Sequence, residues 1–155
     1  MKKESPTYIL SIYDADKAIL DDRNKLDEMY KKLLEETHLT PMTKLDIFID
    51  NDCNQINRGM SANQLIKESG IYNHSFPERS WIRAIVSSCK QFNHIEVRNF
   101  LLRFFNSKAK QRESKLWNHD KDIIEINPLY KGSLIFDGYD IRFDNEGKKL
   151  EEYRR

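Results

Sequence analysis

The sequence predicts an α+β fold in which a strand and a long helix come first, a helical middle follows, and an antiparallel sheet ends the chain. Residues 7–13 are rich in β-branched and aromatic side chains, which is typical of a buried strand. Between residues 15 and 105, apolar residues recur in steps of three and four, as they do on the face of a helix. After residue 112 the spacing changes to alternation, which favours strands.

The first helix is expected to begin after Asp14, because an aspartate side chain at this position accepts hydrogen bonds from free backbone amides. Its apolar residues share one face, acid–base pairs at i,i+4 support the other face, and we expect it to end near Thr37. A second helix is predicted from Thr40 to Gly59. Residues 45–50 taken alone also fit a strand, because their apolar residues alternate with others.

The middle of the chain, residues 61–112, resembles a short helix, a turn and two longer amphipathic helices. Ser61 and Gln64 have the spacing of a capping box, Gly70 suits a helix end, and Pro77 suits the first turn of the next helix. Two apolar stripes then follow at helical spacing, formed by Trp81, Ile82, Ile85, Val86, Cys89 and Phe92, and by Val97, Phe100, Leu101, Phe104 and Phe105.

Positive charge is concentrated on these two predicted helices. Residues 77–115 hold nine Lys or Arg and three Glu, a net charge of +6, whereas the other 116 residues carry 17 basic and 22 acidic side chains, a net charge of −5. Such segregation in a chain of net charge +1 favours a surface for an anionic partner, although a solvated face paired in part with the acidic N-terminal helix is the alternative. The candidate partner-binding residues are Arg79, Arg83, Lys90, Arg98, Arg103 and Lys110.

The C-terminal region predicts a small antiparallel sheet. Residues 123–126 form a short strand that Pro128 closes, and Asp137–Gly138 predicts a tight turn between strands 134–136 and 139–143. Residues 148–155 form an edge strand or a tail, and the first strand of the chain could join this sheet. We expect one domain over residues 1–155, with a subdivision at 1–38, 40–112 and 113–155 as the alternative.

The composition excludes several classes of protein. We expect a cytoplasmic protein of a bacterial host, because no apolar run has the length of a signal peptide or a membrane span. Cys53 and Cys89 are expected to be reduced, buried thiols. No zinc spacing links the cysteines and histidines, and the calcium-loop pattern that begins at Asp50 fails at Gln55 and Ser61. We therefore expect no catalytic residue, no metal and no cofactor, and hence no enzyme.

Residues 64–71 resemble the first helix and turn of a helix-turn-helix motif, with the helix from Pro77 as the DNA-reading helix. The connection of residues 72–76 is longer than the usual three or four residues, which puts the angle between the helices in doubt. This motif makes a DNA-binding transcriptional regulator, with double-stranded DNA as partner, the second hypothesis for function. A small nuclease is the third.

The chain as a whole resembles the small anti-CRISPR proteins of phages and mobile elements that inhibit type II effector nucleases. The resemblance rests on the segments TYILSIYDADKAIL, FPERSWIRAIVSSCKQFNHIEVRNFLLRFF and DGYDIRFDNEGKKLEEY. It implies a non-catalytic inhibitor that binds the host nuclease by protein–protein contact, and this is our first hypothesis. The near-neutral charge departs from the acidic DNA mimics of that group and favours docking through the basic helices. The step that is inhibited and the oligomeric state stay open.

Overall fold

The computed structural model describes residues 6–51, 58–107, 112–118, 121–126, 133–136, 139–143 and 149–154. The elements are β1 (Thr7–Ile12), α1 (Lys17–Leu20), α2 (Arg23–Thr37), β2 (Asp46–Asp50), β3 (Gly59–Ile66), β4 (Ser69–Phe76), the short 3₁₀ helix η2 (Pro77–Arg79), β5 (Trp81–Ser88), α3 (His94–Phe104), β6 (Arg112–Asn118), β7 (Lys121–Ile126), β8 (Ser133–Phe136), β9 (Tyr139–Phe143) and β10 (Lys149–Arg154). The predicted α+β class is confirmed.

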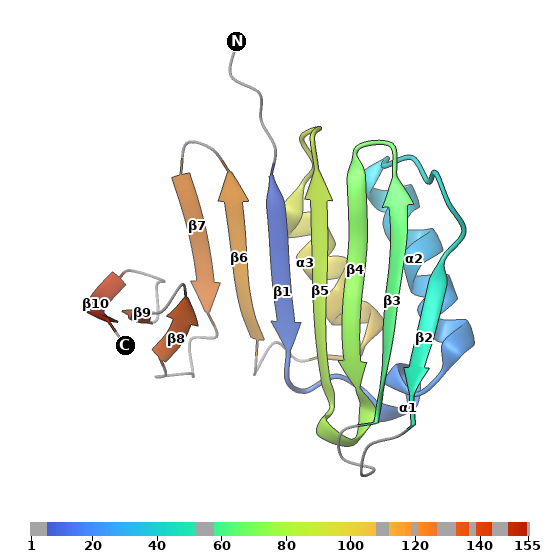
Figure 1. Ribbon diagram of the computed structural model, residues 1–155, viewed down its shortest axis with the longest axis horizontal. Helices are drawn as coiled ribbons and strands as arrows, with labels where there is room; N and C mark the ends of the chain where they lie inside the picture. Colours follow the sequence, from blue (N-terminus) through green and yellow to red (C-terminus); the bar gives the residue numbers. More distant parts are fainter. Residues whose placement is uncertain are drawn as a thin grey trace.

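Seven strands form one sheet in the order β2-β3-β4-β5-β1-β6-β7, and every pairing in it is antiparallel. Helices α2 and α3 both lie behind this sheet in the view of Figure 1, so they cover one of its faces. We call the face opposite these helices the open face. A separate three-stranded sheet of β8, β9 and β10 follows β7.

The core lies between the seven-stranded sheet and its two long helices. Alternate residues of each central strand are buried there, for example Tyr8, Leu10 and Ile12 of β1. Their apolar partners come from α2 and α3, such as Leu33 and Leu101. Each of these side chains contributes about 1.5–3 kcal/mol on burial, so the helix-facing side of the sheet provides most of the stability.

The N-terminal strand is confirmed, whereas the helix after it is divided. Asp14 does not cap a helix, because its carboxylate accepts a hydrogen bond from Ser107 instead. Asp16 caps α1 and Asp22 caps α2, each by accepting hydrogen bonds from backbone amides two or three residues later. Two good caps six residues apart thus start two helices where one was expected. The end of α2 at Thr37 is as predicted.

The helical middle is wrong except for its last helix. The predicted helix from Thr40 contains strand β2 instead, the predicted capping box lies inside β3, and Gly70 lies inside β4. Pro77 begins only the three-residue η2, after which the predicted basic helix is strand β5. Long antiparallel ladders between β3, β4 and β5 satisfy their backbone groups, and this long-range pairing outweighs the local helical spacing. The last predicted helix is confirmed as α3, which Asn93 caps.

The C-terminal strands from β7 onward agree with the sequence prediction, whereas strand β6 was not predicted. Strand β7 contains the predicted strand 123–126, strands β8 and β9 pair as a hairpin, and β10 pairs with β9. The predicted turn at Asp137–Gly138 lies outside the described residues. Strand β1 pairs with β6, so the first strand does join the C-terminal strands, but it also pairs with β5 in the middle of the sheet.

The structure also bears on the cysteines, on metal ligands and on membrane-spanning helices. The Cys89 thiol is exposed, which contradicts its predicted burial, and Cys53 lies outside the described residues. Among the described residues, no cluster of His, Cys, Asp and Glu could hold a metal ion. No helix in the described part of the chain is long and apolar enough to span a bilayer.

Candidate active site at the turn between β3 and β4

Polar groups from separate segments converge around the turn that joins β3 to β4. The Glu68 carboxylate accepts hydrogen bonds from the backbone amide of Thr40 at 3.1 Å and from the Thr40 hydroxyl at 3.2 Å. The backbone oxygen of Glu68 accepts a hydrogen bond of 2.8 Å from the amide of Cys89, just after β5. Ser69 begins β4 and pairs with Ser88 of β5. We call Thr40, Glu68, Ser69, Ser88, Cys89 and Lys90 the Ser69 site.

Ser88 holds the segment that carries Cys89. Its side chain is fully buried, and its hydroxyl donates to the backbone oxygen of Lys90 at 2.6 Å while accepting from the Lys90 amide at 2.9 Å. Its own amide donates to the oxygen of Pro6 at 3.0 Å. The chain after β5 is therefore bent back by one buried hydroxyl group, and this bend keeps the Cys89 amide on Glu68.

The carboxylate of Glu68 stays charged at neutral pH. Burial acts to raise the pKa of Glu68, but hydrogen bonds from Thr40 and from its own amide, together with the positive charge of Lys90, outweigh that effect and hold the pKa below the ordinary value of 4.5. The turn thus presents a fixed negative charge on one side of Ser69 and the Lys90 ammonium group nearby.

The Ser69 site combines groups that are useful for acyl and proton transfer. Ser69 is exposed and supplies a hydroxyl group, and Cys89 supplies an exposed thiol, which is a weak hydrogen-bond donor. The carbonyl group that precedes Ser69 already accepts a hydrogen bond, and a donor in this position stabilises negative charge that develops on the oxygen. The arrangement therefore favours chemistry at the Glu68–Ser69 peptide bond.

A second polar group lies on the open face. His74 of β4 accepts or donates a hydrogen bond of 2.8 Å between its Nδ1 and the Ser61 hydroxyl, and it pairs with Arg83 of β5. Five residues of strand separate Ser69 from His74, which corresponds to about 16 Å. The two groups point to opposite faces of β4 because their positions differ by an odd number. Within one chain, the side chains of His74 and Ser69 therefore do not meet.

The predicted partner-binding residues do not share one helical face. Arg83 lies on the open face, where its Nε donates to the Ser11 hydroxyl at 3.1 Å and its guanidinium group lies 5.5 Å from the centre of the Trp81 ring. Arg103 belongs to α3 on the other side and forms a 3.6 Å ion pair with Glu36 of α2.

The other predicted positions lie elsewhere in the fold. Arg98 is also on α3, Arg79 belongs to η2, and Lys90 belongs to the Ser69 site. Lys110 lies outside the described residues. Of the two adjacent basic helices on which this surface was based, only the second is formed, as α3, whereas the first is strand β5.

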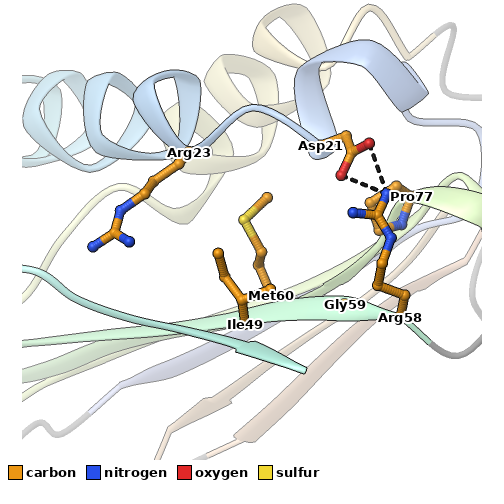
Figure 2. A pocket seen from close by; sticks show the side chains of 7 residues that line it. All are labelled: Asp21, Arg23, Ile49, Arg58, Gly59, Met60 and Pro77. Carbon is orange, nitrogen blue, oxygen red and sulfur yellow. Dashed lines mark hydrogen bonds and ion pairs between the residues drawn. The ribbon is translucent and has the colours of Figure 1, made fainter. Parts of the chain in front are cut away.

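A small cavity lies near the other end of β3 (Figure 2). Its volume is about 90 Å³, and its lining includes Ile49, Met60 and Pro77. On its charged side, one nitrogen of Arg58 lies 2.7 Å from both carboxylate oxygens of Asp21. This volume corresponds to about three water molecules, too little for a nucleoside, so the cavity is not a candidate active site.

The Ser69 site was missed from sequence because its parts meet only in the folded sheet. Glu68 and Cys89 lie 21 positions apart, and their contact depends on the pairing of β4 with β5, which was predicted as helix. Thr40 comes from a third segment, the connection between α2 and β2. No local sequence motif around Glu68 and Ser69 indicates these contacts.

Comparisons with known proteins cover the same region. A sequence model of the S-adenosylmethionine decarboxylase family matches residues 6–115, which are 110 of the 155 residues and include the whole Ser69 site. The adenosylmethionine decarboxylase from Aquifex aeolicus VF5 has a similar fold, with a TM-score of 0.63 and 16% sequence identity over 81% of this chain and 96% of that chain. No curated protein matches significantly.

These findings correct the functional hypotheses drawn from the sequence. The family match contradicts the resemblance to anti-CRISPR inhibitors, the CRISPR effector as partner, and the expectation that the chain is not an enzyme. The helix-turn-helix regulator and its DNA partner are also wrong, because the supposed first helix and reading helix are strands β3 and β5. The nuclease hypothesis is contradicted by the same family match.

Proposed function

The chain belongs to the S-adenosylmethionine decarboxylase family, and from this premise we propose that it removes the carboxylate group of S-adenosylmethionine as CO₂. The observation that carries the proposal is the Ser69 site itself: a serine follows a carbonyl group that already accepts a hydrogen bond from the backbone amide of Cys89, a residue with an exposed thiol. This site lies inside the region that matches the family.

Loss of CO₂ from an α-amino acid leaves a carbanion, which an electron-accepting carbonyl group must stabilise. Pyridoxal phosphate would need a lysine in an enclosed site. Every lysine whose side chain is described is exposed, namely Lys17, Lys25, Lys31, Lys32, Lys44, Lys67 and Lys90. We therefore propose that the carbonyl group comes from the chain itself, as a pyruvoyl group made from Ser69.

The geometry around Glu68 and Ser69 fits the formation of this group. Attack of the Ser69 hydroxyl on the Glu68 carbonyl carbon breaks the peptide bond and leaves an ester, and the Cys89 amide at 2.8 Å stabilises the charge on the oxygen. β-Elimination then removes the Cα proton of residue 69 and breaks its Cβ–O bond, so that the main-chain carboxylate of residue 68 leaves and residue 69 becomes dehydroalanine. Water hydrolyses its enamine form to the pyruvoyl group and releases ammonia, so that chains 1–68 and 69–155 remain.

The other residues of the Ser69 site would act on the substrate. The thiol of Cys89 follows directly after the strand partner of Ser69, so it is the candidate acid that returns a proton to the α-carbon after CO₂ leaves. The main-chain carboxylate of Glu68 becomes the C-terminus of the first chain when the peptide bond breaks. The fixed negative charge of its side chain favours a substrate that carries a positive sulfonium group.

The proposal is tested by mass spectrometry of the purified full chain and by release of labelled CO₂ from carboxyl-labelled S-adenosylmethionine. We expect two chains, 1–68 and 69–155, and CO₂ release that depends on them. The Ser69→Ala variant should stay intact and inactive. The Ser87→Ala variant is the matched control, because Ser87 lies on the neighbouring strand and hydrogen-bonds Thr7 instead. An intact, inactive wild-type chain would overturn the proposal.

A further inference from the structure

The connection between α2 and β2 lies beside the last residues of β3 (Figure 1). Residues 40–43 of this connection, which we call the strap, run antiparallel to β3, with a β-bridge between Pro41 and Ile66. The backbone amide of Lys67 donates to the Thr40 oxygen at 2.8 Å. Strand β4 pairs with the other edge of β3, so the chain that leads to the Ser69 site is held on both sides.

One hydrogen bond of the strap departs from regular strand pairing. Two residues in a hydrogen-bonded antiparallel pair exchange both backbone bonds, so the Thr40 amide would donate to the Lys67 oxygen. It donates instead to the Glu68 carboxylate at 3.1 Å, and the Thr40 hydroxyl donates to the other oxygen of that carboxylate at 3.2 Å. The Glu68 side chain thus takes the place of a backbone acceptor, and one residue of the strap holds both of its oxygens.

Glu68 is held at its backbone as well as at its side chain. Its backbone oxygen accepts the 2.8 Å hydrogen bond from the Cys89 amide, which comes from the far side of β4. Rotation of residue 68 would therefore break contacts with either Thr40 or Cys89. The carbonyl carbon that the Ser69 hydroxyl attacks is presented in one orientation, and a fixed orientation of reacting groups accelerates a reaction within one molecule.

We propose that Thr40 is a positioning residue for cleavage between Glu68 and Ser69, acting through the Glu68 side chain that it holds. This inference rests on the proposed function and adds to it a residue that sets the rate of pyruvoyl formation. Thr40 is exposed, so water can replace its hydroxyl group when that group is removed. The strap keeps a second attachment, because the Gln64 side chain donates to the Thr43 oxygen at 2.8 Å.

The test is the cleavage rate of the newly made full chain, followed by mass spectrometry after cell-free synthesis. Thr40→Val removes the hydroxyl group at nearly constant shape and should slow cleavage about five- to tenfold. Thr40→Ser keeps a hydroxyl group and should recover most of the rate. Thr43→Val is the matched control, because this exposed threonine of the same strap accepts a 3.1 Å hydrogen bond from the Leu65 amide instead. It should change the rate by less than about twofold.

A double-mutant cycle separates positioning from a general weakening of the fold. Glu68→Ala removes the carboxylate, so Thr40→Val added to it should slow cleavage by less than a further twofold or so. If Glu68→Ala abolishes cleavage, the rates of the Thr40→Val and Thr40→Ser variants decide. Circular dichroism checks that each variant is folded.

Three results would overturn the role of Thr40 alone: a wild-type rate in Thr40→Val, equal slowing by Thr43→Val, or no recovery in Thr40→Ser. The full effect of Thr40→Val in the Glu68→Ala background would also contradict action through Glu68. A wild-type chain that never cleaves would overturn the proposed function, and this inference with it.

Discussion

Replacing Ser88 by alanine should reveal how the protein holds the Ser69 site together. The substitution removes one buried hydroxyl group, which forms two hydrogen bonds of 2.6 and 2.9 Å with the backbone of Lys90. Nothing else in the site is changed directly. The amide of Cys89, which lies between these two residues, should then no longer be held firmly against the Glu68 carbonyl group.

The expected loss of stability follows from the two hydrogen bonds. Each contributes about 1 kcal/mol net, and water can replace part of the loss because Lys90 is exposed, so we expect about 1.5 kcal/mol in total. For a chain of this size that loss lowers Tm by about 3–6 °C, which calorimetry measures directly. We also expect cleavage between Glu68 and Ser69 to slow by about tenfold or more, because its charge-stabilising amide is less well held.

Ser87→Ala is the matched control, since this neighbouring serine points to the open face and its hydroxyl bonds to the Thr7 hydroxyl, at 3.1 Å. It should cost less than about 1 kcal/mol and leave the cleavage rate unchanged. If both variants lowered Tm and the cleavage rate equally, the inference that Ser88 positions the Ser69 site would be refuted. If Ser88→Ala lowered Tm alone, Ser88 would be structural and Cys89 would be held by other contacts.

Other predictions concern the sheet and its polar groups. Tyr30→Phe removes a buried hydroxyl that donates a 2.8 Å hydrogen bond into β4, so urea unfolding should show a loss of about 1–2 kcal/mol; a loss below about 0.5 would contradict it. Gly59→Ala should cost about 2 kcal/mol more than Gly70→Ala, because the added carbon meets a backbone oxygen at 2.5 Å in the first case and a flexible tyrosine ring in the second. Glu68→Gln should reduce Tm most above pH 4.5 and progressively less as the pH falls through the lowered pKa of Glu68, since the stability from that carboxylate is lost on protonation. A Tm difference independent of pH would contradict this.

The parts of the fold that the sequence predicted are those decided by local contacts. Strand β1 and helices α2 and α3 are correct because caps such as Asn93 and one-sided apolar patterns act over a few residues. The C-terminal hairpin is also local, since its strands follow one another closely. Strands β3 and β5 were missed because their spacing of apolar residues is not the spacing of a strand with one wet face.

The reason is visible in β3 and β5. In β3, Gln64 faces the core and is satisfied by the Thr43 oxygen at 2.8 Å, while apolar Leu65 faces the other way. In β5, Trp81 and Ile85 lie on the open face, and Ile82 and Val86 lie in the core. Adjacent apolar residues from two faces produce steps of one, three and four, which are also the steps of a helix. The strand pairings and the hydrogen bond of buried Gln64 join residues that are distant in the sequence, so neither could be inferred from the local pattern.

The misleading pattern is itself evidence about the molecule. A strand buried on both faces carries apolar residues at consecutive positions, whereas a strand with one solvated face alternates. Strand β5 has the first pattern, yet the chain covers only one of its faces with helices (Figure 1). The pattern that predicted a helix therefore comes from the apolar residues that the helices leave on the open face, such as Trp81 and Ile85, which stand next to the core residues Ile82 and Val86.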